Sequence, residues 1–223
     1  MKYFTYKLDS LLLNVFSVIL LIFMVIITYL ITSDLSFITE MNWFSFLMLF
    51  GWMIIHELLH GIGFISLGKV NSKSVVFGVE IEKGIFYCMC KEKVSKSNVL
   101  IALLFPLFLI GIITYIIGII FNNDLLIFLS VFNIAGAIGD IVMTIDIMLM
   151  PKDIMYLDLD DTIGFTILSD KDISVNKYFL INLMKKGKYT DKLIASDYTK
   201  FKISKFSYYF FIIFIILFVL FIL

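Results

Sequence analysis

Five long apolar runs, separated by shorter polar segments, dominate the pattern of this sequence. A helix needs about 20 consecutive apolar residues to cross a hydrocarbon core of roughly 30 Å. Runs of about that length lie at residues 11–32, 43–67, 99–121, 125–150 and 206–223. They predict an all-α polytopic membrane protein with five transmembrane helices, folded as a single membrane domain over residues 1–223.

Two of the polar segments have a strand-like pattern. Within segment 68–98, residues 75–90 alternate loosely around the turn-prone Glu82-Lys83-Gly84, which predicts a β-hairpin. Within segment 151–205, residues 155–169 show a second strand-like pattern. Residues 171–205 are expected to form short helices on the membrane surface.

The lysines orient the predicted spans. Cytoplasmic segments are enriched in basic residues, and all 18 basic residues of this chain are lysines. They fall at the N-terminus, in segment 68–98 and in segment 151–205, whereas segments 33–42 and 122–124 hold none. Five spans with a cytoplasmic N-terminus therefore place every lysine, the hairpin and the segment before the last span on the cytoplasmic side.

Composition agrees with a membrane protein and excludes other classes. The chain is 61% hydrophobic and 16% charged, whereas a soluble domain has about 25% charged residues. The first apolar run lacks a small-residue cleavage site and is expected to be retained. Zero net charge without a basic stripe gives no support for nucleic-acid binding. The lysine-only basic set and the abundance of Ile, Phe and Asn favour an AT-rich bacterial genome, and hence the bacterial cytoplasmic membrane.

The second predicted span carries the sequence His56-Glu57-Leu58-Leu59-His60. Residues four apart share one face of a helix, so both histidines can offer a ring nitrogen to one metal ion. In zinc sites of this pattern the metal lowers the pKa of its water to roughly 7 and the glutamate acts as general base. These are the only two histidines of the chain, and an ionisable group inside the bilayer costs at least about 2.5–3.5 kcal/mol. Hydrogen bonding of the three side chains within the bundle is the less favoured alternative.

Depth in the membrane selects a third metal ligand. A catalytic zinc site usually has three protein ligands and a water, and no third histidine remains. The rise of a helix puts His56 and His60 roughly 20–26 Å from the outer end of their span. Asp140 lies at about 23 Å in the fourth span and Asp146 at about 32 Å, so Asp140 is the predicted ligand. A structural carboxylate bonded to a neighbouring helix is the alternative for Asp140.

Asn133 precedes Asp140 by seven residues and lies on about the same helix face. Its amide can bond a metal ligand or the backbone of a substrate. An interhelical hydrogen bond is an equally favoured role for it.

Three further features are expected to be structural. Cys88 and Cys90 share a strand face and are expected to be reduced, apolar and buried rather than metal ligands or a disulfide. Pro106 is expected to kink the third span without a functional role. Three acidic residues do not follow the spacing of a calcium loop and are expected to form a solvated turn: Asp158, Asp160 and Asp161.

The order of these features resembles a known family, the putative zincin peptidases of bacterial membranes, formerly a domain of unknown function. The resemblance covers about residues 40–165 and lies in His56-Glu57-x-x-His60-Gly61, the polar hairpin, a proline-bearing third span and Asn133…Gly139-Asp140. It implies a zinc-dependent peptidase whose ligands are His56, His60 and an aspartate of a later span. The layout is also distantly similar to the site-2 protease class of intramembrane metalloproteases. Asp140 departs from the Asn-Pro-Asp-Gly-like motif of that class, because it stands in a Gly-Asp-Ile sequence.

Motif and resemblance together predict a zinc-dependent intramembrane or membrane-associated peptidase that acts near the cytoplasmic face. Its expected cofactor is Zn²⁺, and its expected partners are the lipid bilayer and a peptide or membrane-protein substrate. The alternative is a non-catalytic metal-binding membrane regulator or an immunity-type protein. A metal transporter is less favoured, because the carboxylates inside the spans are confined to the cytoplasmic half: Glu57, Asp140 and Asp146.

Overall fold

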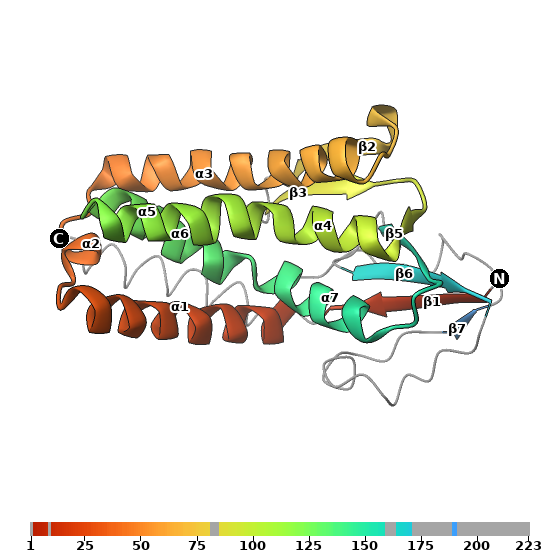
Figure 1. Cartoon of the computed structure of the whole chain (residues 1–223), viewed down its shortest axis with the longest axis horizontal. Coiled ribbons are helices and arrows are strands. Elements are labelled where there is room, and N and C mark those ends of the chain that lie inside the picture. The colour runs from red at the N-terminus through yellow and green to blue at the C-terminus, as the bar shows by residue number, and fades with distance from the viewer. Residues whose placement is uncertain (1, 9, 81–84, 159–163, 171–188, 191–223) are drawn as a thin grey trace. The chain divides into compact units, whose positions relative to one another are not determined.

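The computed structural model describes residues 2–8, 10–80, 85–158, 164–170 and 189–190, and helices make up most of them (Figure 1). Four of the predicted spans fall in the described residues and are helical. The elements are α1 (Ser10–Thr32), α2 (Ser36–Thr39), α3 (Trp43–Ile62), the π-helix η1 (Gly63–Leu67), the 3₁₀-helix η2 (Ser72–Ser74), α4 (Lys96–Pro106), the π-helix η4 (Leu107–Ile113), α5 (Thr114–Ile120), α6 (Asp124–Gly136) and α7 (Ile138–Leu149).

Three helical runs are long and apolar enough to cross a membrane: Leu11–Thr32, Trp43–Leu67 and Lys96–Ile120. The fourth predicted span, residues 125–150, is broken, because α6 and α7 meet at Ala137 with a bend of 48°. The pair counts as one further span only if taken together. The glycines on either side of Ala137 have low helix propensity, which favours a break there. The predicted span 206–223 lies outside the described residues, as do nearly all of the predicted surface helices of residues 171–205.

The predicted hairpin of residues 75–90 is confirmed. Strand β2 (Val75–Glu80) pairs antiparallel with β3 (Ile85–Cys90), and Phe77 lies opposite Cys88. Residues opposite each other in such a ladder point to the same face. Phe77 and Cys88 therefore share one face of the hairpin, while Gly78 and Tyr87 share the other.

A second sheet corrects the expectation of an all-α fold with one hairpin. It has five antiparallel strands in the order β4-β5-β6-β1-β7. The strand-like pattern of residues 155–169 forms β5 and β6, as predicted, whereas the other three strands have no forerunner in the sequence pattern. The strands are β1 (Lys2–Lys7), β4 (Val94–Ser95), β5 (Met155–Asp158), β6 (Gly164–Ser169) and β7 (Tyr189–Thr190).

The chain packs as two compact units, divided inside α3 between His56 and Glu57. Unit 1 comprises Met1–Asp9, Glu57–Phe105 and Asp140–Lys202, and unit 2 comprises Ser10–His56, Pro106–Gly139 and Ile203–Leu223.

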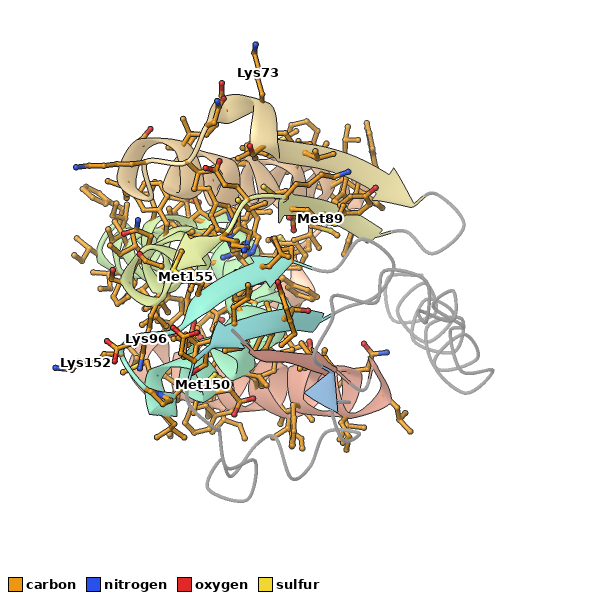
Figure 2. The ribbon with its side chains drawn as sticks, turned by 90° about the vertical axis from the view of Figure 1, so that its right-hand side faces the viewer. Lys73, Met89, Lys96, Met150, Lys152 and Met155 are labelled. Atoms are coloured by element: carbon orange, nitrogen blue, oxygen red, sulfur yellow. The ribbon has the colours of Figure 1, made fainter. Side chains whose placement is uncertain are left out.

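The core of unit 1 joins its sheets to its helices. Tyr156 of β5 is buried and stacks on Phe165 of β6, with ring centroids 5.6 Å apart. The same cluster contains Cys90 of β3, Ala102 of α4 and Ile147 of α7. The ends of two helices are joined by polar contacts. Lys96, at the start of α4, donates to the carbonyls of Met148 and Met150 at the end of α7 (Figure 2). A lysine in that position complements the negative end of the helix dipole.

Unit 2 has an apolar interior and large apolar side chains on its outer surface. Inside, Phe128 of α6 is buried and meets Phe46 of α3 edge to face at 5.4 Å. Thr28 of α1 bonds Tyr115 of α5 at 2.8 Å. On the outside, side chains such as Leu30 are exposed, that one to 73%. Apolar surface of this kind is stable in lipid and costly in water.

Candidate metal centre

The His-Glu-x-x-His turn lies on one continuous stretch of α3. Each of His56, Glu57 and His60 can present one ligand atom so that the three atoms lie within 4.8 Å of one another. Both imidazoles are buried, with 9% and 6% of their surface exposed, and Glu57 is half-buried. The helix thus brings together two nitrogen donors and one carboxylate, as their spacing predicts.

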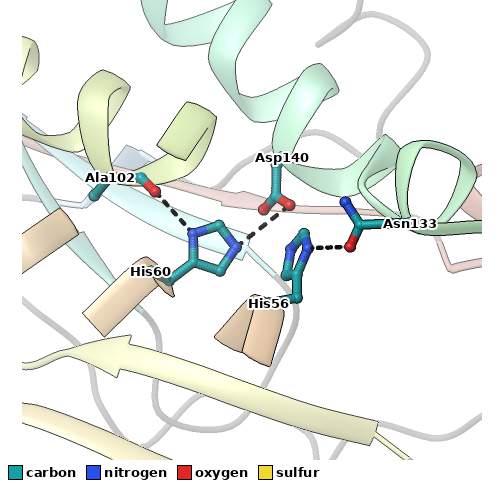
Figure 3. Close-up of polar contacts among 5 residues, drawn as sticks. All are labelled: His56, His60, Ala102, Asn133 and Asp140. Carbon is teal, nitrogen blue, oxygen red and sulfur yellow. Dashed lines mark hydrogen bonds and ion pairs between the residues drawn. The ribbon is translucent and has the colours of Figure 1, made fainter. Parts of the chain in front are cut away.

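Within unit 2, His56 is held by Asn133 of α6 (Figure 3). The Nδ1 atom of His56 lies 2.9 Å from the amide oxygen of Asn133. Because an amide oxygen only accepts, Nδ1 is the protonated nitrogen of this ring and Nε2 carries the lone pair. The sequence places Asn133 near a metal ligand or a substrate, and the structure puts it against a histidine.

Within unit 1, His60 contacts two groups (Figure 3). Its Nδ1 atom lies 2.8 Å from the backbone carbonyl oxygen of Ala102 in α4, and a carbonyl again requires the proton on Nδ1. Its Nε2 atom lies 3.4 Å from Oδ2 of Asp140. Asp140 belongs to the first turn of α7, where the positive end of the helix dipole stabilises a carboxylate. The break at Ala137 creates that helix start.

The arrangement fits a divalent metal of the zinc type. Ligating histidines commonly donate their second ring nitrogen to a carbonyl, a carboxylate or water, and both histidines do the equivalent here. Zinc–ligand bonds of about 2.1 Å in a tetrahedron put two ligand atoms about 3.4 Å apart. The Nε2–Oδ2 separation of His60 and Asp140 is 3.4 Å. The donor set and this spacing are therefore compatible with bound zinc.

The hairpin β2–β3 packs against the C-terminal part of the motif in unit 1. A Cβ atom on Gly61 would lie 2.2 Å from the far end of the Phe77 ring, so a side chain at residue 61 would displace that ring. Cys88 lies on the same hairpin face. The pKa of its thiol is raised mainly by burial and, to a smaller extent, by the nearby carboxylates of Glu57 and Asp158. A neutral, half-buried Cys88 without a disulfide agrees with the sequence-based expectation of a reduced, apolar cysteine.

Asp158 is not part of a solvated turn, contrary to expectation. Its Oδ2 accepts a hydrogen bond of 2.7 Å from the backbone N–H of Cys90, and its Oδ1 accepts one from the Tyr156 hydroxyl. Burial and the neighbouring Asp158 raise the pKa of Tyr156 well above its ordinary value, so its hydroxyl is the donor. Asp160 and Asp161 lie outside the described residues.

Two contacts of unit 1 were not predicted from the sequence: that of the Ala102 carbonyl with His60 and that of Asp158 with Cys90. The carbonyl of Ala102 has no side-chain signature, although the proline four residues later indicates an irregular helix there. The tie between Asp158 and Cys90 joins two separate strands. A contact between residues so far apart in the sequence leaves no local sequence pattern.

A His-Glu-x-x-His turn on a helix is the pattern of zincin-type metal centres. Residues 49–155 match the model of the family described as "Putative zincin peptidase". This match confirms the family resemblance drawn from the sequence; it does not extend to the site-2 protease class. No curated protein and no solved structure matches the chain.

Proposed function

We propose that this protein is a zinc-dependent peptidase that hydrolyses peptide bonds within or beside a membrane, near its cytoplasmic face. The observation that carries the proposal is that two buried histidines are each held in place by a hydrogen bond. The Nδ1–H group of each ring donates to an oxygen of the protein, that of Asn133 or that of Ala102. Glu57 lies between the two histidines on the same helix turn. The family description supports the same activity.

In the proposed site His56, His60 and Asp140 would hold the metal, each histidine through its Nε2 atom and Asp140 through a carboxylate oxygen. When bound, zinc supplies a Lewis acid that polarises a carbonyl and makes water acidic near neutral pH. Neighbouring groups of the protein orient these ligands. Asn133 and Ala102 fix the two imidazole rings, and the positive end of the α7 helix dipole stabilises the Asp140 carboxylate.

Glu57 is the proposed general base. Its carboxylate accepts the proton of the attacking water and returns it to the leaving amine. Asn133 has a second proposed role, because its Nδ2 is buried and makes no hydrogen bond within the described part of the chain. This amide N–H can donate to the carbonyl of a bound peptide, which would satisfy a buried donor that is otherwise costly.

The proposed location is the bacterial cytoplasmic membrane, with the N-terminus in the cytoplasm. Apolar helical runs of spanning length support a membrane location. The lysine distribution supports the orientation. The proposed substrate is accordingly a membrane-embedded or membrane-adjacent peptide.

Replacing Glu57 by Gln separates a peptidase from a metal-binding regulator. The full chain in lipid nanodiscs is incubated with a pool of peptides taken from membrane-protein segments, and cleavage is read by mass spectrometry. Loss of the base lowers the cleavage rate by about 10² or more, while zinc, measured by elemental analysis, stays at the wild-type level. Glu40→Gln, an exposed carboxylate in the α2–α3 connection, leaves both unchanged. Cleavage that persists in Glu57→Gln would refute the peptidase mechanism.

A further inference from the structure

The carbonyl that holds His60 belongs to an irregular place in its helix. In a regular α-helix, the carbonyl of Ala102 would accept from the backbone N–H of residue 106. Residue 106 is a proline, which has no N–H and whose ring pushes against the carbonyl four residues before it. The α-helix α4 ends at Pro106 and continues as the π-helix η4. Ala102 has therefore lost its usual helical donor, and its oxygen lies 2.8 Å from Nδ1 of His60.

A close approach of two helices brings this carbonyl to His60. Gly63 lies three residues after His60, on the same face of the helical run. A Cβ atom on Gly63 would lie 2.9 Å from the Cα of Ala102, which is closer than real Cβ contacts. The backbone of α4 can come this near only because residue 63 has no side chain.

We propose that Pro106 and Gly63 are positioning residues for the metal ligand His60. Pro106 leaves the Ala102 carbonyl without its helical donor, and Gly63 lets that carbonyl reach the imidazole. Together they keep the proton on Nδ1 and turn Nε2 towards Asp140. This gives Pro106 a role where the sequence led us to expect a kink without function. The inference rests on the proposed metal site and not on the proposed peptidase activity.

The protein contains its own reference for testing this role. His56 and His60 are the only histidines of the chain, so ¹⁵N-histidine labelling gives one pair of ring-nitrogen signals for each of the two imidazoles. His56 is held by the side chain of Asn133 and not by the Ala102 carbonyl. Perturbing the carbonyl should therefore change the His60 signal and leave the His56 signal in place.

The experiment uses the full chain in nanodiscs, with zinc as the probe. Zinc affinity is measured by competition with a chelator, and the protonated nitrogen of each ring is identified from two-bond ¹H–¹⁵N spectra of the zinc-bound protein. In Pro106→Ala, the new backbone N–H competes for the Ala102 carbonyl. We expect the zinc Kd to rise about tenfold, as for other losses of a ligand's hydrogen-bond partner, and the His60 ring signals alone to shift.

Two glycine variants form a matched pair. Gly63→Ala pushes the Ala102 backbone away and should reproduce the His60-specific shift and the weaker zinc binding. In Gly118→Ala, the new Cβ would meet Ile127 at the same 2.9 Å but within unit 2. It should leave the His60 signals and the zinc Kd unchanged.

The possible outcomes distinguish this positioning role from the proposed metal site and from the proposed peptidase activity. A zinc Kd in Pro106→Ala within about twofold of wild type, against the tenfold expected, would overturn the positioning role. Ring signals of both histidines that move together would do the same. A wild-type chain that binds no zinc would overturn the metal site along with it. A chain that binds zinc as expected but cleaves no peptide would overturn only the peptidase.

Discussion

His56 and His60 use chemically different acceptors for the same purpose. His56 donates to a side-chain amide, and His60 donates to a backbone carbonyl. In both, the acceptor decides which ring nitrogen keeps the proton, and so which one is left for a metal. Only the side-chain acceptor can be replaced directly by mutation.

Replacing Asn133 tests the holding of His56. Asn133→Ala removes the acceptor, and we expect zinc affinity to fall about 10–100-fold. Asn133→Asp keeps an acceptor oxygen and should retain wild-type affinity to within about tenfold. Both variants lack the Nδ2 donor, so both should cleave peptides more slowly than wild type. Chelator competition gives the affinities, and the peptide-pool assay gives the rates.

Asn14→Ala, at an exposed position of α1, serves as the matched control and should behave as wild type. Equal zinc affinity in Asn133→Ala and in wild type would show that His56 does not need this hydrogen bond.

At the scale of elements, the hairpin β2–β3 is held at two places, once against α3 and once against the five-stranded sheet. Phe77 lies against Gly61, and the N–H of Cys90 at the base of the hairpin is held by Asp158 of β5. The buried Tyr156 hydroxyl holds the second oxygen of the same carboxylate. Asp158 therefore ties the hairpin to the five-stranded sheet, and Cys88, on the Phe77 face, reports whether the hairpin is seated.

Thiol alkylation of Cys88 tests this seat. The thiolate is the reactive form, and the raised pKa of Cys88 makes its reaction slow at pH 8. In a Cys90→Ala parent, which leaves Cys88 as the only thiol, Asp158→Ala should release the hairpin and lower the pKa of Cys88 towards its ordinary value. Below the pKa, the thiolate fraction rises about tenfold for each unit that the pKa falls. We expect a maleimide to label Cys88 about tenfold faster or more.

Two further variants separate the hydrogen bond from the charge. Asp158→Asn removes the charge but keeps an acceptor for the Cys90 N–H, so its labelling rate should stay closer to that of the parent. Asp153→Asn removes an exposed charge before β5 and should have no effect. If Asp158→Asn is labelled as fast as Asp158→Ala, electrostatics and not the seat controls Cys88.

At the scale of the whole molecule, the N-terminus is part of the sheet in unit 1. Strand β1 pairs along its length with β6, more than 150 residues later in the chain, so that Phe4 lies opposite Ile167. On its other side Phe4 lies opposite Tyr189 of β7. A residue paired on both sides has its backbone N–H directed into the sheet, where proline is not tolerated.

Phe4→Pro tests the importance of β1. We expect loss of the ladder around β1 and faster amide hydrogen exchange in β6, measured by mass spectrometry. Phe4→Ala keeps the backbone N–H and should retain the protection of β6, so the difference between the two variants isolates the backbone contribution. Equal protection in both variants would mean that β6 does not depend on β1.

The sequence by itself determined the features that depend on neighbouring residues. Runs of apolar residues determine the helices, because a segment in lipid must satisfy its backbone internally. Spacing by four puts His56 and His60 on one helix face, and alternation around a turn specifies the hairpin. The rise of a helix puts Asp140 at the depth of His56 and His60, and the structure places its carboxylate 3.4 Å from His60.

Tertiary structure decided the partners of these groups. The acceptor for His60 is a main-chain carbonyl, which every residue possesses, so residue identity could not single out Ala102. The seat of the hairpin joins β3 to β5, and the sheet joins β1 to β6; both are pairings between distant segments that local periodicity does not encode. A short strand such as β1 is stable only when its partners cover it. Its existence is therefore a property of the packed molecule and not of the six residues that form it.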